Sequence, residues 1–481
     1  MKQAFAEFAP DAAKTDANAT SINRNVVPVE GGAYIPALAK SAYSGALSAA
    51  PRGAISFQTQ DGNWRVVAAT LTEIFILDAS DMTWDSAGSG YTGPDTDENW
   101  SFATYRGYLY ATNVNDGLQR LEMEAGTTFA AVAGSPPAAR YAGVVEDYLV
   151  LGALGSDTSA VAWCDTFDAT DWSTGNADDQ SFSDLGPVMG ICGAAKKIIQ
   201  QRGERYMVHQ PGSSVVFAFE KIANARGAIA PMSIIEIGAD VAMLAKDGFY
   251  FNNEPIGKGK VDRWFFATVN QSRLRAVQGA FDPLRRVFRW GFHTGDAAAF
   301  DWQLIYSPVF DRWSVVVDNA AYLLTLATAG LTLGGLAALY ATLNDVPYPF
   351  GSSVWQGGVD GFAVIGDDNK LSFYEGTALE ATLATGEREW SPGQRIDING
   401  IRPEVEGDTA AAATARLGYR SRLQDSVSYT SYNAMNSDGM IPFLANGRYF
   451  SAEVKIAAGT TWTHAKGIVI DDYDIHKRGR R

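Results

Sequence analysis

Short apolar runs broken by Gly, Asn and Asp recur through most of this 481-residue chain. The segment from Trp100 to Glu122 shows the pattern: a strand, a turn at Arg106-Gly107, a second strand, a turn at 115–117 and a third strand. Gly, Asn and Asp accept the positive φ of tight hairpin turns, and the runs lack helical periodicity. The pattern predicts a chain built from antiparallel β-hairpins.

The hairpins form about eight units, spaced roughly 28 to 57 residues apart, and residues 77–86 are echoed at 167–174. A period of about 40–50 residues with several strands in each is typical of a β-propeller. We therefore expect an all-β fold with a propeller of about six to eight blades over residues 51–376. Stacked β-sandwiches are the alternative, but local hairpins need no long Greek-key crossover.

The segments on either side of the propeller differ from it in composition. Residues 1–50 are rich in Ala, Ser, Asn and Thr, which predicts an N-terminal arm: a flexible tail, or a strap on a neighbouring subunit. Residues 377–481 contain longer alternating strands and predict a C-terminal antiparallel β-sandwich or sheet domain. The chain ends in a basic tail, Lys477-Arg478-Gly479-Arg480-Arg481, of a kind that is either solvated or in contact with an acidic partner or nucleic acid. The expected anchors of the strap are Ile22, Val26, Val27, Tyr34 and Ile35.

An uncharged stretch, Ala320–Leu343, is long enough to span a membrane. Its glycines and threonines and its acidic flanks, Asp318 and Asp345, argue against a span, so we expect no stable membrane insertion. The stretch predicts a buried strand over 322–327 and then a short helix beginning at Thr332. The N-terminus has no apolar core of a signal peptide, which predicts assembly in a cytoplasm.

Charge is distributed unevenly along a chain whose net charge is −15. Residues 81–185 contain 17 acidic and 3 basic residues, whereas residues 186–293 contain 8 acidic and 15 basic residues. Neighbouring regions of opposite sign suit a subunit that packs head-to-tail in a ring. Two differently charged solvated faces are the alternative. The acidic balance disfavours a general nucleic-acid binder.

The sequence contains no motif that carries chemistry. The four histidines lie far apart, and no HExxH, paired CxxC or GxSxG motif is present. Cys164 and Cys192 are expected to be buried free thiols, and Gly257–Lys260 a hairpin tip. The 95–106 run lacks the glycine and glutamate of a calcium loop. We predict no catalytic, cofactor-binding or metal-binding residue, and not an enzyme.

Acidic pairs are the one feature that suits an enzyme. A propeller glycosidase would place two carboxylates across a pocket, and this stays the enzymatic alternative. We expect each pair to lie in a solvated turn instead. The pairs are Glu146-Asp147, Asp178-Asp179, Asp367-Asp368 and Asp471-Asp472.

Short motifs spread over nearly the whole chain carry a family resemblance. They are Asn23–Pro28, Gly31–Tyr34, Trp100–Ala103, Ala111–Asn113, Ile198–Phe219, Gly227–Ala230, Asn399–Pro403, Gly447–Tyr449 and Ala457–Trp462. Through them the chain resembles bacteriophage virion proteins of the tail-nozzle or packaged-DNA-stabilisation type, found below the portal and adaptor of short-tailed phages. None of these motifs is catalytic.

The resemblance implies a propeller-bearing structural subunit that forms a ring, a hexamer, in the virion tail. The ring would extend the tail tube, retain the packaged DNA and pass it at ejection without sequence-specific contact. The implied partners are the portal or adaptor protein and tail fibre or other tail proteins, with assembly in the cytoplasm of a bacterial host. An acidic wall over 81–185 would repel phosphate and let DNA slide past. A glycan-active propeller enzyme (a depolymerase) and a tail hub or binding propeller are the alternatives.

Overall fold

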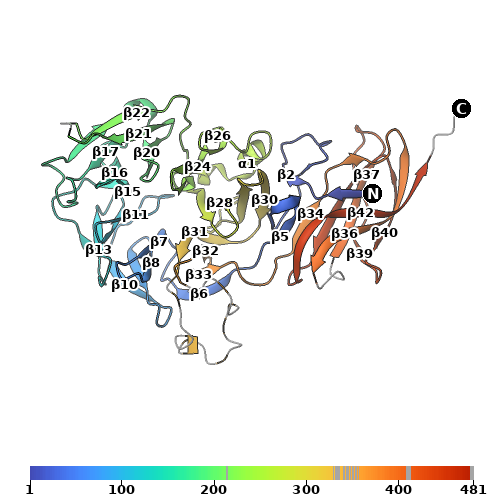
Figure 1. Cartoon of the computed structure of the whole chain (residues 1–481), viewed down its shortest axis with the longest axis horizontal. Coiled ribbons are helices and arrows are strands. Elements are labelled where there is room, and N and C mark those ends of the chain that lie inside the picture. The colour runs from blue at the N-terminus through green and yellow to red at the C-terminus, as the bar shows by residue number, and fades with distance from the viewer. Residues whose placement is uncertain are drawn as a thin grey trace.

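The computed structural model describes residues 1–476 apart from 213–214, 408–412 and most of 329–356. Within these residues, seven four-stranded antiparallel sheets follow one another around an axis, and a two-sheet sandwich lies beside them (Figure 1). The predicted all-β propeller is therefore confirmed, with seven blades. The predicted hairpin units 276–292 and 304–317 belong to one blade, which is why eight units make seven blades.

Six blades are continuous in sequence. Blade 1 is β7 (Gly53–Gln58), β8 (Trp64–Ala69), β9 (Glu73–Leu77) and β10 (Trp84–Ser89), and blade 2 is β11 (Ser101–Tyr105), β12 (Tyr108–Thr112), β13 (Gln119–Glu122) and β14 (Ala130–Ala131). Blade 3 is β15 (Ala139–Val145), β16 (Tyr148–Leu154), β17 (Ala160–Trp163) and β18 (Asp178–Ser181), and blade 4 is β19 (Val188–Cys192), β20 (Lys197–Gln200), β21 (Gly203–His209) and β22 (Phe217–Lys221). Blade 5 is β23 (Ile235–Ile237), β24 (Asp240–Ala245), β25 (Gly248–Phe251) and β26 (Glu254–Pro255), and blade 6 is β27 (Gln278–Asp282), β28 (Val287–Phe292), β29 (Trp302–Ser307) and β30 (Arg312–Val316).

Blade 7 closes the ring with strands from two parts of the chain. It contains β31 (Ala320–Ala327), β32 (Asp360–Gly366), β33 (Lys370–Phe373) and, as its outermost strand, β6 (Ser41–Ala46) from the N-terminal region. The first strand of this blade, β31, contacts β27 on one side and β7 on the other. The last blade thus meets the first, and no propeller end is left open.

The hairpin turns have the geometry that the sequence predicts. Arg106 and Gly107 join β11 to β12, and both have positive φ, 53° and 82°. The echoed segments 77–86 and 167–174 occupy the turn between the third and fourth strands of blades 1 and 3. In each, an aspartate accepts a hydrogen bond from the backbone N–H two residues ahead, as Asp168 does from Thr170 at 2.8 Å.

The C-terminal strands form two sheets of a sandwich at the right of Figure 1. One sheet has the order β4 (Val26–Pro28), β5 (Tyr34–Pro36), β42 (Trp462–His476), β36 (Arg395–Gly407) and β40 (Ile441–Gly447), with β1 (Lys2–Ala4) also on β42. The other has the order β34 (Ala381–Ala384), β41 (Tyr449–Ile456), β37 (Ala413–Arg420) and β38 (Ser428–Tyr429), with β35 (Arg388–Glu389) on β41 and β39 (Asn433–Ala434) on β37. Three N-terminal strands thus complete a sheet of the C-terminal sandwich.

The remaining elements are short. β2 (Glu7–Phe8) and β3 (Ala19–Thr20) form a parallel pair, and α1 spans Asp262–Thr268. The 3-10 helices are η1 (Glu30–Gly32), η2 (Ser183–Leu185), η3 (Pro231–Ser233) and η4 (Gln271–Ala276). The predicted strand 322–327 lies within β31, whereas the predicted helix from Thr332 lies outside the described residues. No helix in the described part of the chain is long and apolar enough to cross a membrane.

Residues 1–36, which we name the strap, contribute β1, β4 and β5 to the sandwich, and β2 and β5 lie on the side of the sandwich that meets the propeller (Figure 1). The sequence predicts a flexible tail or a strap on a neighbouring subunit, but here the strap lies against its own chain. Phe5 is buried in the sandwich core, and Phe8 is buried among side chains of blades 5 and 6, edge-on to Trp264 at 4.9 Å. Two aromatic rings three residues apart therefore anchor the strap in both bodies.

Hydrogen bonds hold the rest of the strap in place. The Asp11 carboxylate accepts from the backbone N–H groups of Arg263 and Trp264, at 2.6 and 2.9 Å, and so caps the start of α1. Buried Asn23 donates to the Ala6 carbonyl oxygen at 2.5 Å and accepts from the Ala384 N–H at 2.8 Å. The strap is therefore bonded to the propeller and to the sandwich.

Replacing Phe8 with alanine tests this anchoring. Phe8 is 1% exposed, so F8A leaves a cavity and should lower the free energy of unfolding by about 3–5 kcal/mol, measured by urea denaturation. The matched control is F167A, because Phe167 is 50% exposed and its loss should change stability by less than about 1 kcal/mol. Equal losses in the two variants would show that Phe8 is not an anchor.

Candidate functional site

An ion-pair cluster, which we name the axis clamp, joins loops of blades that are not neighbours. Glu98 precedes blade 2 and is 4% exposed, and Arg275 precedes blade 6. The Arg275 guanidinium donates to the Glu98 carboxylate through two nitrogens, with Nε to Oε1 at 2.9 Å. The same carboxylate accepts from the Tyr141 hydroxyl at 3.1 Å and lies 3.7 Å from Arg140. Because blades 2 and 6 face each other across the ring, the clamp spans the propeller axis.

The electrostatics of the clamp keep its charges fixed. Burial, and then the negative charge of Glu98, raise the pKa of the Tyr141 phenol, so this hydroxyl stays a neutral donor. Burial lowers the pKa of Arg275, but Glu98 together with Tyr141 and Asp97 more than offsets this, so the net direction is upward. A second pair, Arg273 Nε to Asp97 Oδ1 at 3.2 Å, lies beside the first. The clamp is thus a paired, hydrogen-bonded buried charge cluster.

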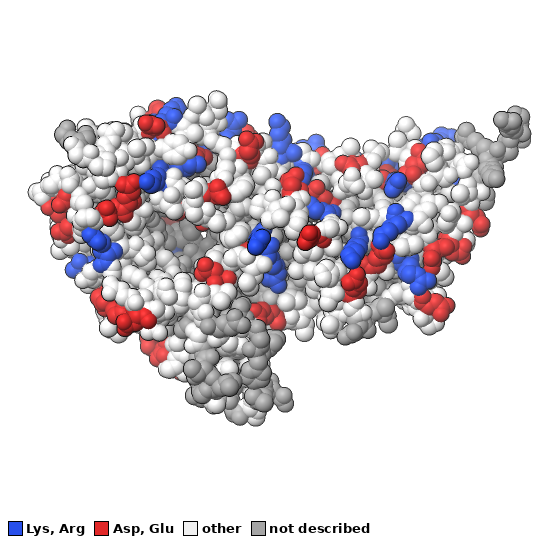
Figure 2. Space-filling view, in the orientation of Figure 1, with Lys and Arg blue, Asp and Glu red and all other residues white. Residues whose placement is uncertain are grey.

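A pocket of about 270 Å³ adjoins the clamp. Its lining includes Asp97, Asn99 and Arg273, and His293 forms part of its wall. His293 is 2% exposed, and burial and the nearby Arg273 lower its pKa, so the ring is neutral near pH 7. Its Nδ1 has no hydrogen-bond partner among the described residues. Figure 2 shows the propeller hollowed near its centre.

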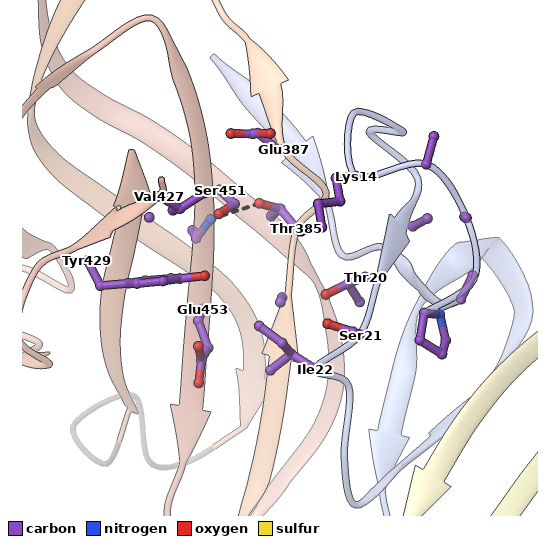
Figure 3. Close-up of a pocket in the computed structure, with 18 of the residues that line it drawn as sticks. Lys14, Thr20, Ser21, Ile22, Thr385, Glu387, Val427, Tyr429, Ser451 and Glu453 are labelled. Atoms are coloured by element: carbon purple, nitrogen blue, oxygen red, sulfur yellow. Dashed lines mark hydrogen bonds between the residues drawn. The ribbon is translucent and has the colours of Figure 1, made fainter. Parts of the chain in front are cut away.

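A recess lies between the strap and the sandwich (Figure 3). Two pockets of about 310 and 460 Å³ share Ser21, Ile22 and Glu453, so they form one groove, which we name the strap groove. Strap residues face the side chains of β34, β38 and β41 across it.

Two of the three carboxylates that line the strap groove, Glu387 and Glu453, are paired with arginines. Glu387 receives two hydrogen bonds from the Arg420 guanidinium, with Nε to Oε1 at 2.6 Å. The Glu453 carboxylate accepts a hydrogen bond from Arg416 Nε at 2.8 Å and another from the Tyr432 hydroxyl. A glycosidase needs one protonated and one free carboxylate across its pocket. The groove therefore gives the enzymatic alternative no support.

The strap groove carries a positive balance. Five cationic and three anionic side chains line it, a net charge of +2. Lys14, Arg24 and Lys455 form no ion pair among the described residues, while the carboxylates Glu387 and Glu453 are each held by an arginine. The cations are Lys14, Arg24, Arg416, Arg420 and Lys455, and the anions are Glu380, Glu387 and Glu453.

The opposite charge gathers at the outer part of blade 3, which we name the acidic edge. All four residues of its outermost strand, β18, are exposed. Figure 2 shows Asp and Glu side chains at the left end of the propeller, where Figure 1 places β16 and β17. Among the residues that the structure describes, no member of this edge forms an ion pair. Its members are Asp157, Asp165, Asp168, Asp171, Asp178 and Asp179.

The sequence predicts that all four acidic pairs lie in turns, and the structure places two of them there. Glu146-Asp147 and Asp367-Asp368 lie in turns, but Asp178-Asp179 lies on β18 and Asp471-Asp472 on β42, so the prediction is wrong for these two. Successive strand residues point to opposite faces, and on an outermost strand such as β18 both faces reach solvent. The predicted hairpin tip at 257–260 is instead the turn that leads from β26 into α1.

The other candidate ligands are dispersed. Cys164 and Cys192 are buried free thiols, as predicted. Within the described ranges, no group of three or more His, Cys, Asp or Glu could hold a metal ion. Asp95 and Asp97 of the calcium-like run pair instead with Arg140 and Arg273. Sequence reasoning missed the axis clamp, because its partners lie 177 residues apart.

Comparison with known proteins finds similarity among solved structures. No family model and no curated protein matches the chain. Similar solved structures include YCF48 bound to D1 peptide, with 13% identity over 71% of this chain and 97% of that one, at a TM-score of 0.37. A second is the β-propeller domain of Cps50 (Swd1) from Myceliophteria thermophila, with 9% identity over 62% of this chain and 97% of that one, at a TM-score of 0.35. A third is a chain of a mitotic checkpoint complex, with 10% identity over 73% of this chain and 94% of that one, at a TM-score of 0.34. At such TM-scores the propeller assignment depends on the sheet order itself.

Neutralising Glu98 tests the axis clamp. E98Q keeps the side-chain shape but leaves the half-buried Arg275 charge less well paired, and because Arg275 is partly screened by solvent we expect a loss of about 1–3 kcal/mol in the free energy of unfolding. The matched control is E254Q on β26, where the side chain is exposed and the change should be within about 0.5 kcal/mol. Urea denaturation of both variants measures the difference. A loss in E98Q no larger than in the control would contradict a clamping role.

Proposed function

We propose that this chain is a structural subunit of a bacteriophage tail. In this proposal six copies form a ring, the nozzle, below the portal or adaptor, and the ring lines the DNA channel. The observation that carries the proposal is the separation of unpaired charge, with an acidic edge on blade 3 and a cationic groove beside the strap. Surfaces of opposite sign at different places on one chain suit heterologous contacts, which form a ring when the rotation between neighbouring copies closes.

The positions of the family-like motifs support the proposal. Asn23 bonds the strap to the sandwich, and Arg24 forms backbone bridges with Thr382 of the sandwich and Val315 of blade 6. Gly227 lies so close to blade 4 that a Cβ there would stand 2.0 Å from the Gln200 carbonyl oxygen. These residues hold strands together and allow close packing, as expected for motifs of a structural virion protein.

The strap suits a subunit that has to stay whole while DNA passes. Phe5 and Phe8 anchor it in both bodies, and Asp11 caps α1, so propeller and sandwich are tied by more than the two covalent connections, residues 37–40 and the segment after β33. Acidic side chains of blades 1 and 2 are assigned to the channel wall, where they repel phosphate and prevent DNA from sticking.

The mass of the purified chain tests the proposal. We expect a ring of about six times 51.7 kDa by mass photometry, and a ring with an open centre by negative-stain electron microscopy. Because the subunit contacts are electrostatic, the ring should dissociate as salt increases. A chain that stays at 51.7 kDa at every concentration, alone and with its portal or adaptor, contradicts the proposal. Polysaccharide cleavage by that monomer would favour the depolymerase.

A further inference from the structure

We infer that the strap groove of one copy receives the acidic edge of blade 3 from a second copy of this chain. The inference depends on the proposed function, since it names the two surfaces that meet in the ring. It commits to one occupant of the groove, because the unpaired charges of the two surfaces are opposite. The groove has a net charge of +2, and the edge has six aspartates with no ion-pair partner among the described residues.

The groove cations are held in place before any partner arrives. The Arg24 guanidinium lies over the Trp302 ring at 5.0 Å, and the Lys455 ammonium lies over the Tyr432 ring at 4.6 Å. Such contacts restrict long side chains without neutralising them, so less conformational entropy is lost on binding. The cations are therefore available to carboxylates from outside the chain.

The acidic edge is also ordered in advance. Asp168 and Asp171 accept hydrogen bonds from backbone N–H groups of their own loop, which fixes the turn before β18. The Asp165 carboxylate accepts from the Asn176 N–H at 2.7 Å. β18 is the last strand of its sheet, so its outer backbone groups have no sheet partner. A short, acidic, extended segment of this kind fits an elongated cationic groove.

The two surfaces belong to different copies. In Figure 1 blade 3 lies at the left end of the propeller, whereas β2 and β5 of the strap lie on the side of the sandwich that meets the propeller. Because the propeller stands between them, the acidic edge cannot enter the groove of its own chain. The contact is therefore heterologous, and a closed ring forms when the rotation between successive copies returns to the first one. The acidic side chains of blades 1 and 2 remain for the channel wall.

Charge reversal with rescue tests the pairing. One variant carries D178K and D179K on the edge, a second carries K14E and K455E in the groove, and a third carries all four. Each double reversal should raise the dissociation constant of the ring about tenfold or more, because like charges then face each other. The fourfold variant should recover to within about threefold of the unmodified chain, since opposite charges face each other again. Mass photometry of the full-length chains at low and high salt gives these constants.

Matched controls reverse the same number of charges elsewhere. D240K with E254K changes two exposed acidic residues of blade 5, and K246E with K258E changes two exposed basic residues. Circular dichroism melting checks that every variant is folded. Reversals that weaken the ring no more than the controls, or a fourfold variant that is not rescued, overturn the inference while the ring itself still supports the proposed function. A chain that forms no ring before any substitution overturns both.

Discussion

The closure of the propeller by β6 is the constraint on which the rest of the structure depends. A circle of sheets has to be joined at its ends, and here the backbone of β6 is hydrogen-bonded to β33 from the far end of the propeller. Only residues 37–40 separate β6 from β5, so the end of β5 has to lie within roughly 18 Å of blade 7. The strap is therefore placed beside blades 6 and 7, and the sandwich that it completes is placed there with it. The strap groove exists because ring closure and sandwich completion use adjacent stretches of one N-terminal segment.

Local features of this fold could be predicted from the sequence, and features that join distant residues could not. The turn at Arg106-Gly107 is encoded by the residues that form it, which is why hairpin positions are recognisable. The number of blades is not local, because nothing in residues 276–317 states that two hairpins share one sheet. The position of β6, and the docking of the strap on its own chain, depend on cores formed by residues more than 200 positions away. These cores exist only in the folded protein.

The same limit applies to charge. Counted along the sequence, Glu98 and Asp178 are equal contributors to the acidic stretch 81–185. In the structure Glu98 is buried and its charge is neutralised by Arg275 of the same chain. Asp178 is exposed and forms no ion pair among the described residues. Buried pairs of this kind hold parts of a fold in register and contribute little field outside it. The sequence thus indicates that an acidic region lies next to a basic one. Only the structure distinguishes the acidic residues of the candidate interface from those of the axis clamp.

In a ring held by the contacts inferred here, the contacts within each subunit would be stronger than the contacts between subunits. Within a subunit, the axis clamp and the strap depend on buried groups, which salt screens weakly and which resist distortion. Between subunits, exposed carboxylates and cations meet at a rim, where each pair contributes little and the sum is sensitive to the surroundings. Movement during DNA passage would then occur at the subunit boundaries, because those contacts are the weaker ones, while each propeller and its sandwich stay joined. This division follows from where the chain buries its charges, and it would let a nozzle change its opening without unfolding any subunit.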